Sequence, residues 1–235
     1  MIYNEGHRLE HAVAAICPDI EERVALNGPA FTERQLWWEL CCCLLSSQVP
    51  YYLAVAAADA VDASGLMLDS RESSTLATKL SSILSDGVTI DGKRRTYRFP
   101  IARANQLAET RAAVTQQAGT LQTLLTNFSD AAEARIWFVN NAPGLGPKQA
   151  SMFLRNAGQS YDLAILDRHV LNYMATLGLS EKSKQSISAL PQYRQYEETL
   201  RSHAAQLGFA VGLLDWAIWI VMRVEGSPNM EFEFV

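Results

Sequence analysis

The chain of 235 residues has no cysteine after position 43, and its four cysteines lack the spacing of a metal site. They are Cys17 and the run Cys41-Cys42-Cys43, whose neighbours would point in different directions on a helix. We therefore expect reduced thiols in the core, and no metal ion.

Long apolar runs are also lacking, because no uninterrupted stretch approaches the length of a membrane span. The first seven residues do not have the basic-then-apolar pattern of a secretion signal. These two absences predict a cytoplasmic protein without membrane attachment. With 49% hydrophobic residues, the chain can bury a substantial core as one compact unit or as two intimate lobes.

An excess of positive charge is lacking as well: 20 Lys and Arg face 25 Asp and Glu, for a formal net charge of −5. A protein that binds duplex nucleic acid usually presents excess positive charge, so any such surface must be local. One half of the chain does gather cations, at Lys93-Arg94-Arg95, Arg98, Arg103, Lys148, Arg155 and Arg168. The run at 93–95 suits a solvated loop as well as a phosphate contact.

Strand-like runs are few, at residues 88–90 and 232–235 only, whereas helical periodicity recurs along the chain. An all-α architecture is therefore predicted. The expected helices lie near residues 11–26, 32–47, 53–61, 75–85, 101–117, 121–126, 131–139, 147–155, 169–177, 193–207 and 212–223.

A tight turn joins two of these helices at residues 141–147. Pro143 and Gly144 end the first helix, Gly146 can cap the second, and Pro147 suits its first position because that N–H has no intrahelical partner to lose. The free amides at the positive end of the second helix would attract a phosphodiester without reading its sequence. A simple helix connection explains the same turn.

Lys148 follows in the first turn of that helix, where the helix dipole and partial burial favour the neutral, nucleophilic amine. Such an amine can attack a sugar carbon and form a Schiff base. Asp167 follows the apolar run at 163–166, where it could cap the next helix and face Lys148. Taken singly, the two residues also fit a solvated lysine and an ordinary capping aspartate.

Residues 144–156 and 164–171 together resemble the helix-hairpin-helix motif of DNA glycosylases, and most of all the 8-oxoguanine DNA glycosylase/lyases of the compact Ogg2-like branch. The resemblance implies that Lys148 is the nucleophile. It implies that Asp167 supports the positively charged sugar in the transition state and assists proton transfer.

Three further stretches fit the same family. Gln48 ends a Leu-Ser-x-Gln turn, which implies an amide that fills the space left by a flipped base. Phe99 stands in an Arg-Phe-x-x-x-Arg-Ala element and Trp219 in a Leu-Asp-x-x-x-Trp element, which implies two aromatic walls for that base. Asp215 lies in an apolar helix and needs a partner, either the hairpin helix or a purine N–H. Helix termination by Gln48 and core packing of both aromatic residues are the alternatives.

The resemblance also implies an architecture: a single glycosylase-type unit over residues 1–235, with one lobe from the terminal helices and a middle lobe at about 50–165 that ends in the hairpin. The catalytic pair would line a cleft between the lobes. DNA contacts are expected from Gln48, Gly144, Gly146, Arg155 and His169. No cofactor is needed, and the missing C-terminal cysteines exclude the iron–sulfur cluster of endonuclease III relatives.

The function expected is a bifunctional DNA glycosylase/AP lyase that flips 8-oxoguanine out of a damaged duplex and removes it. One alternative is a glycosylase-fold protein that binds or processes a guanine-like or 7-deazaguanine base on a non-duplex substrate in a bacterial antiviral system. Another is a non-catalytic helical interaction module. The acidic, aromatic tail at 224–235 departs from the family pattern and puts the lesion specificity in question.

Overall fold

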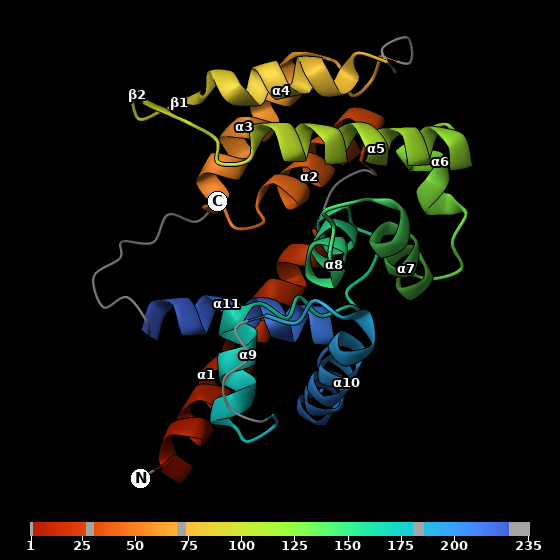
Figure 1. Cartoon of the computed structure of the whole chain (residues 1–235). Helices are drawn as coiled ribbons and strands as arrows, with labels where there is room; N and C mark the ends of the chain where they lie inside the picture. The colour runs from red at the N-terminus through yellow and green to blue at the C-terminus, as the bar shows by residue number, and fades with distance from the viewer. Residues whose placement is uncertain (1, 27–30, 70–73, 181–185, 226–235) are drawn as a thin grey trace. The chain divides into compact units, whose positions relative to one another are not determined.

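The computed structural model describes residues 2–26, 31–69, 74–180 and 186–225 (Figure 1). These residues form eleven helices and one small two-stranded sheet, so the all-α prediction is confirmed. All eleven expected helices are found among them. The largest difference is in the first helix, which begins at Ile2 rather than near residue 11.

The chain divides into two compact units. The terminal unit consists of Met1–Pro29 with Ser160–Val235, and the middle unit of Ala30–Gln159. The middle unit thus begins near residue 30, earlier than the expected 50, because the helix at 33–45 packs with the helices that follow it. A single glycosylase-type entity with a cleft between lobes stays a prediction.

The terminal unit is built around its last helix. Its helices are α1 (Ile2–Ala25), α9 (Arg168–Thr176), α10 (Leu190–Leu207) and α11 (Val211–Glu225). Helix α11 packs against the other three (Figure 1), with Leu214, Ala217 and Ile218 fully buried. An apolar stripe at this spacing explains why the segment is helical and which face it buries.

The middle unit is organised by a buried helix near its start. Its elements are α2 (Glu33–Leu45), α3 (Tyr51–Ala63), α4 (Leu76–Asp86), β1 (Val88–Ile90), β2 (Lys93–Arg95), α5 (Pro100–Ala118), α6 (Leu121–Thr126), α7 (Ala131–Asn141) and α8 (Pro147–Asn156). Helix α2 begins with a capping box between Thr32 and Gln35, and packs against α3, α5, α6 and α8. The Glu33 carboxylate accepts hydrogen bonds from the first two backbone amides of α6. These bonds join the start of α2 to the start of α6.

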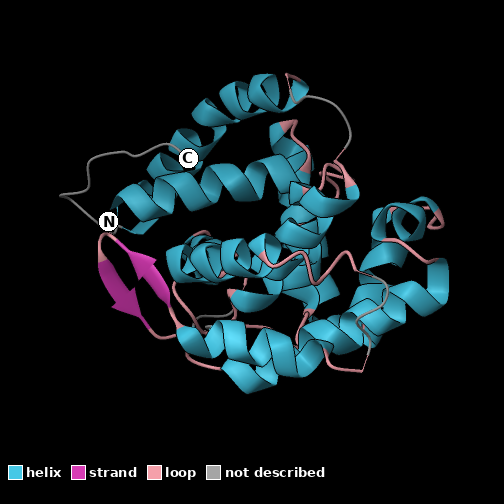
Figure 2. Ribbon diagram, turned by 90° about the horizontal axis from the view of Figure 1, so that it is seen from above, coloured by secondary structure: helices cyan, strands magenta, loops and turns pink. Residues whose placement is uncertain are grey.

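The predicted strand at residues 88–90 is confirmed, and its partner is the basic run (Figure 2). Val88 pairs with Arg95 and Ile90 with Lys93 in an antiparallel hairpin. The solvated-loop interpretation of residues 93–95 is therefore wrong, although all three side chains are exposed. Gly87 permits the hairpin, since a Cβ there would come 2.8 Å from the carbonyl oxygen of Arg95. The expected strand at 232–235 lies outside the described residues.

In the described part of the chain, no single helix is both long and apolar enough to cross a membrane. Taken together, helices α10 and α11 have the length and apolar composition of a membrane span, but the chain bends by 91° between them.

All four cysteines are free and buried. Burial is the main cause that raises the pKa of the Cys17 thiol to about 11 and of Cys41 to about 12, and it raises the pKa of Cys42 and Cys43 as well. Thiolate is the reactive form, so the folded protein should be inert to thiol reagents.

We expect no reaction of the native protein with a chromogenic disulfide reagent at about pH 8, near the ordinary thiol pKa. Unfolding in guanidinium should release all four thiols. Rapid labelling of the native protein would contradict the buried positions.

Candidate functional site

The turn between α7 and α8 has the predicted hairpin form. Helix α7 ends at Asn141, Gly146 is the N-cap of α8, and Pro147 takes its first position. Gly144 has φ +90°, and a Cβ there would approach the Gln106 side-chain oxygen to 2.5 Å. The positive φ is the reason for glycine at 144, and the close contact is with the movable end of the Gln106 side chain.

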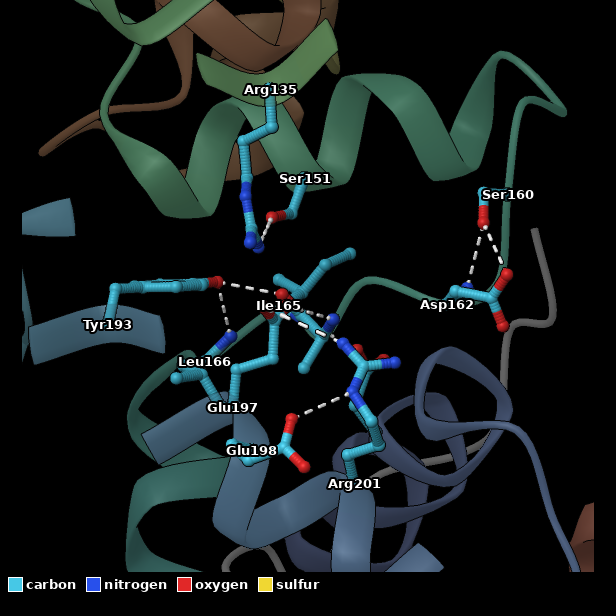
Figure 3. A network of polar contacts seen from close by, with 12 residues as sticks. Arg135, Ser151, Ser160, Asp162, Ile165, Leu166, Tyr193, Glu197, Glu198 and Arg201 are labelled. Carbon is cyan, nitrogen blue, oxygen red and sulfur yellow. Dashed lines mark hydrogen bonds and ion pairs between the residues drawn. The ribbon is translucent and has the colours of Figure 1, made fainter. Parts of the chain in front are cut away.

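A buried polar contact braces this hairpin. Arg135 of α7, which is 1% exposed, donates from Nη1 to the Ser151 hydroxyl of α8 at 3.2 Å (Figure 3). The two helices on either side of the turn are thus linked by a hydrogen bond as well as by the edge-to-face rings of Phe138 and Phe153. These two contacts hold α7 and α8 together on either side of the turn that precedes Lys148.

Lys148 is the second residue of α8 and is half-buried. No side chain caps this helix start and no acidic residue lies in its first turn, so the positive end of the dipole is not neutralised locally. The cation of Lys148 acts on the Cys43 thiol of α2, where it opposes the burial that raises the Cys43 pKa. Lys148 thus stands at the junction of α8 and α2.

Beneath this helix, α2 carries a buried carboxylate. Glu39 is 6% exposed and accepts hydrogen bonds from Asn156 Nδ2 at 2.7 Å and from Cys43 Sγ at 3.4 Å. Burial raises the pKa of Glu39, and the nearby cation of Arg155 acts in the opposite direction. Arg155, expected to contact DNA, is half-buried at the end of α8 and helps to balance this carboxylate.

Asp167 is the N-cap of α9, as predicted, and accepts from the Val170 amide at 2.9 Å through Oδ1. It is half-buried, and His169 is the second residue of the same helix. The capping bond fixes one carboxylate oxygen. Among the described residues no hydrogen bond to Oδ2 is found.

The segment that leads to Asp167 is extended but belongs to no sheet, and side chains satisfy its backbone (Figure 3). Tyr193 accepts from the Leu166 amide at 2.9 Å and donates to the Ala164 carbonyl at 2.8 Å. Glu197 accepts from the Ala164 amide at 2.8 Å. We call Tyr193, Glu197 and Asp215 the backbone clamp.

Asp215 completes the clamp. It is 2% exposed on α11 and accepts a hydrogen bond from the Ile165 amide, which is one partner for the buried carboxylate. Its expected contact with the hairpin helix or with a purine stays a prediction. Nearby, the Gly212 amide donates to the Tyr161 carbonyl at 2.8 Å, and a Cβ on Gly212 would overlap that oxygen. Helix α11 therefore holds the Asp167 segment at two points.

Sequence reasoning missed Tyr193 and Glu197. The signal was their spacing of four residues on α10, which places two polar side chains on one face, and both are buried at 0% and 3% exposure. Polar residues at core positions of a helix point to a partner elsewhere in the chain.

The two aromatic candidates lie in different units. Phe99 is the N-cap residue of α5 in the middle unit and is half-buried, with the Arg98 guanidinium 4.9 Å from its ring centre. Trp219 on α11 is 37% exposed, with the Arg223 guanidinium 4.8 Å from its ring centre. Core packing is therefore the wrong interpretation of Trp219, and each ring stands beside a cation.

Gln48 is exposed in the turn after α2 and has φ +61°, a conformation that L side chains rarely adopt. The middle unit thus carries Gln48, Phe99, Gly144, Gly146, Lys148 and Arg155, and the terminal unit carries Asp167, His169, Asp215 and Trp219. The meeting of the catalytic pair stays a prediction. The described residues contain no cluster of three or more potential metal ligands.

Replacement of Tyr193 by Phe should lower the free energy of unfolding by about 1–3 kcal/mol, because it leaves a buried amide and a buried carbonyl without their partner. Urea unfolding measures the loss. Tyr52→Phe, at an exposed tyrosine, is the control and should be neutral. Equal effects of the two changes would contradict the clamp.

Replacement of Glu39 by Gln should stabilise the protein increasingly as the pH rises. Burial raises the folded-state pKa of Glu39, so its contribution to stability is complete below the unfolded-state pKa and is lost as the pH rises through the folded-state value. Gln keeps an acceptor for Asn156 and does not titrate. Urea unfolding of both proteins between about pH 4 and 8 measures the difference, which should shrink toward the acid end. A difference in the free energy of unfolding that does not change with pH would contradict the raised pKa of Glu39.

The family model described as 8-oxoguanine DNA glycosylase matches residues 23–209. The 8-oxoguanine DNA glycosylase/AP lyase of Sulfurisphaera tokodaii is 32% identical over 201 residues, which are 84% of this chain and 86% of that protein.

Solved structures of this family have a similar fold. The 8-oxoguanine DNA glycosylase of Thermotoga maritima superimposes with a TM-score of 0.68 at 28% identity, over 98% of this chain and 100% of that chain. The Methanocaldococcus jannaschii 8-oxoguanine glycosylase/lyase in complex with 15mer DNA containing 8-oxoguanine shares the fold, with a TM-score of 0.67 at 21% identity over 91% and 96% of the two chains. The chain therefore belongs to the helix-hairpin-helix family of 8-oxoguanine DNA glycosylases.

Proposed function

We propose that this protein is a bifunctional DNA glycosylase/AP lyase that removes 8-oxoguanine from duplex DNA. The observation that carries the proposal is the family match through residues 23–209, which includes Lys148 in the first turn of α8 and Asp167 at the N-cap of α9. Relatives of this family are 8-oxoguanine DNA glycosylase/AP lyases.

The lesion must leave the base stack before a side chain can reach its sugar. Phe99 and Trp219 are our candidates for the two walls of the base pocket, because each has exposed ring surface in its own unit. Gln48 is exposed at a turn and can occupy the vacated place in the duplex. Asp215 bonds the backbone before Asp167, and it is also our candidate to receive a purine N–H in the base pocket.

The chemistry starts with the Lys148 side-chain nitrogen, which attacks in its deprotonated form because only that form has a free electron pair. Its nitrogen forms a bond to C1′ while the glycosidic bond breaks and the base leaves with that electron pair. Asp167 stabilises the positive charge on the sugar. The attached amine gives up a proton, the C1′–O4′ bond breaks as O4′ takes up a proton, and the opened sugar carries a Schiff base at C1′. This Schiff base loses a C2′ proton, and the 3′ phosphate leaves with the electrons of its C3′–O bond, which nicks the strand.

The DNA backbone is held by a small part of the surface. The hairpin amides at Gly144 and Gly146 offer donors to one phosphate. The exposed cations Lys93, Arg95 and Arg98 offer a local positive region on a chain whose net charge is −5. Phosphate contact by the basic hairpin stays a prediction.

Nothing in the described residues favours a non-duplex guanine-like ligand or a non-catalytic module over DNA. The tail at 226–235, whose acidic character departs from the family, lies outside the described residues. A cytoplasmic location also stays a prediction.

Borohydride should trap a covalent complex between the protein and a duplex that contains 8-oxoguanine, because it reduces the Schiff base. Replacement of Lys148 by Gln should abolish trapping and nicking. Replacement of Asp167 by Asn keeps an N-cap acceptor for Val170, so it should preserve folding and DNA binding while it slows base release by at least about 100-fold. Undiminished trapping by the Lys148→Gln protein would refute the assignment of the nucleophile.

A further inference from the structure

The turn that carries Gln48 adopts a backbone conformation it would not keep by itself. Gln48 has φ +61° without being glycine, and its side chain is exposed. Such residues persist where the surrounding structure determines them, and they concentrate at functional sites. The groups that hold this turn therefore control where the Gln48 amide points.

Two buried side chains from one later segment hold the turn. The Tyr97 hydroxyl donates to the Leu45 carbonyl at 2.7 Å, and Arg103 donates from Nη2 to the Ser47 carbonyl at 3.2 Å. Tyr97 is 1% exposed and Arg103 is 9% exposed. Both bonds are long-range in sequence, so they anchor the turn to the start of α5.

The same guanidinium reaches the hairpin. Arg103 donates from Nη1 to the Gln106 side-chain oxygen at 2.7 Å. Gln106 in turn packs against Gly144, where an added Cβ would lie 2.5 Å from that oxygen and 3.0 Å from Arg103 Nη1. The guanidinium carbon also lies 5.8 Å from the centre of the Phe99 ring. The Arg103 side chain thus lies beside three features: the turn that carries Gln48, the hairpin turn at Gly144, and the ring of Phe99.

Arg103 was expected to belong to a basic surface, and its burial contradicts that expectation. Its Nε is buried without a hydrogen-bond partner among the described residues, so the position is not optimised for stability alone. We infer that Arg103, with Gln106, is a positioning residue for base extrusion. It fixes the position of the Gln48 turn relative to the hairpin turn and to Phe99. This inference rests on the proposed function.

A positioning role at this step has a distinctive consequence. An amide that fills the place of the flipped base matters most when the lesion is paired, because extrusion must then break a base pair. It matters less when the lesion has no partner. Loss of Arg103 should therefore slow excision from a paired duplex more than excision from an unpaired one, whereas general destabilisation would slow both equally.

The test compares single-turnover excision of 8-oxoguanine placed opposite cytosine with excision of the same lesion opposite an abasic analogue. We expect Arg103→Met to slow the paired reaction at least about tenfold more than the unpaired one, since small misplacements of a positioning group have effects of this size. Gln106→Met should also slow the paired reaction more than the unpaired one. It provides the test if Arg103→Met does not fold.

Arg111→Met is the matched control, because Arg111 is also a buried arginine of α5 but bonds the Asp69 carbonyl instead. It should leave the ratio of the two rates as it is in the parent. Amide hydrogen exchange at residues 45–49 is the second measurement, and it should accelerate in Arg103→Met and not in Arg111→Met.

An unchanged rate ratio in both Arg103→Met and Gln106→Met, with a parent that excises the lesion, would overturn this inference alone. A parent that excises from neither duplex would overturn the proposed function and the extrusion role together. Unchanged exchange at residues 45–49 would overturn the claim that Arg103 holds the turn.

Discussion

A backbone that leaves secondary structure inside a protein must find other hydrogen-bond partners, and this constraint shapes the terminal unit. Residues 164–166 are buried and extended, yet no strand of the described segments pairs with them. The backbone clamp supplies the partners from two helices, with Tyr193 and Glu197 on α10 and Asp215 on α11. Buried amides without such partners would be costly, so the clamp fixes the path of the chain to Asp167.

The features that sequence could predict were local ones. Apolar periodicity identified the helices, and Gly146 with Pro147 identified the start of α8, because caps depend on neighbouring residues. The run at 163–166 was recognised as apolar, but the side chains that bond its backbone were not. Tyr193 and Asp215 lie 27 and 50 residues from the atoms that they bond, and no local pattern encodes such a pairing.

Charge was the least predictable property. Arg103 and Arg155 counted as surface cations in the sequence, but the first is buried and the second is half-buried beside Glu39. Lys93 and Arg95 remain exposed, on a strand that the sequence did not indicate. A guanidinium looks the same in sequence whether it meets solvent, a carbonyl or a carboxylate, so the functional surface is smaller than the count of basic residues implies.

The two attachments of α11 to the segment before Asp167 have a structural consequence. The Gly212 amide donates to the Tyr161 carbonyl and the Asp215 carboxylate accepts from the Ile165 amide, so two hydrogen bonds attach the segment to the first turns of the helix. Trp219 stands one turn further along that helix. Under the proposed function, the helix that carries the Trp219 wall of the base pocket also fixes the backbone that leads to the capping carboxylate, so one element positions both groups.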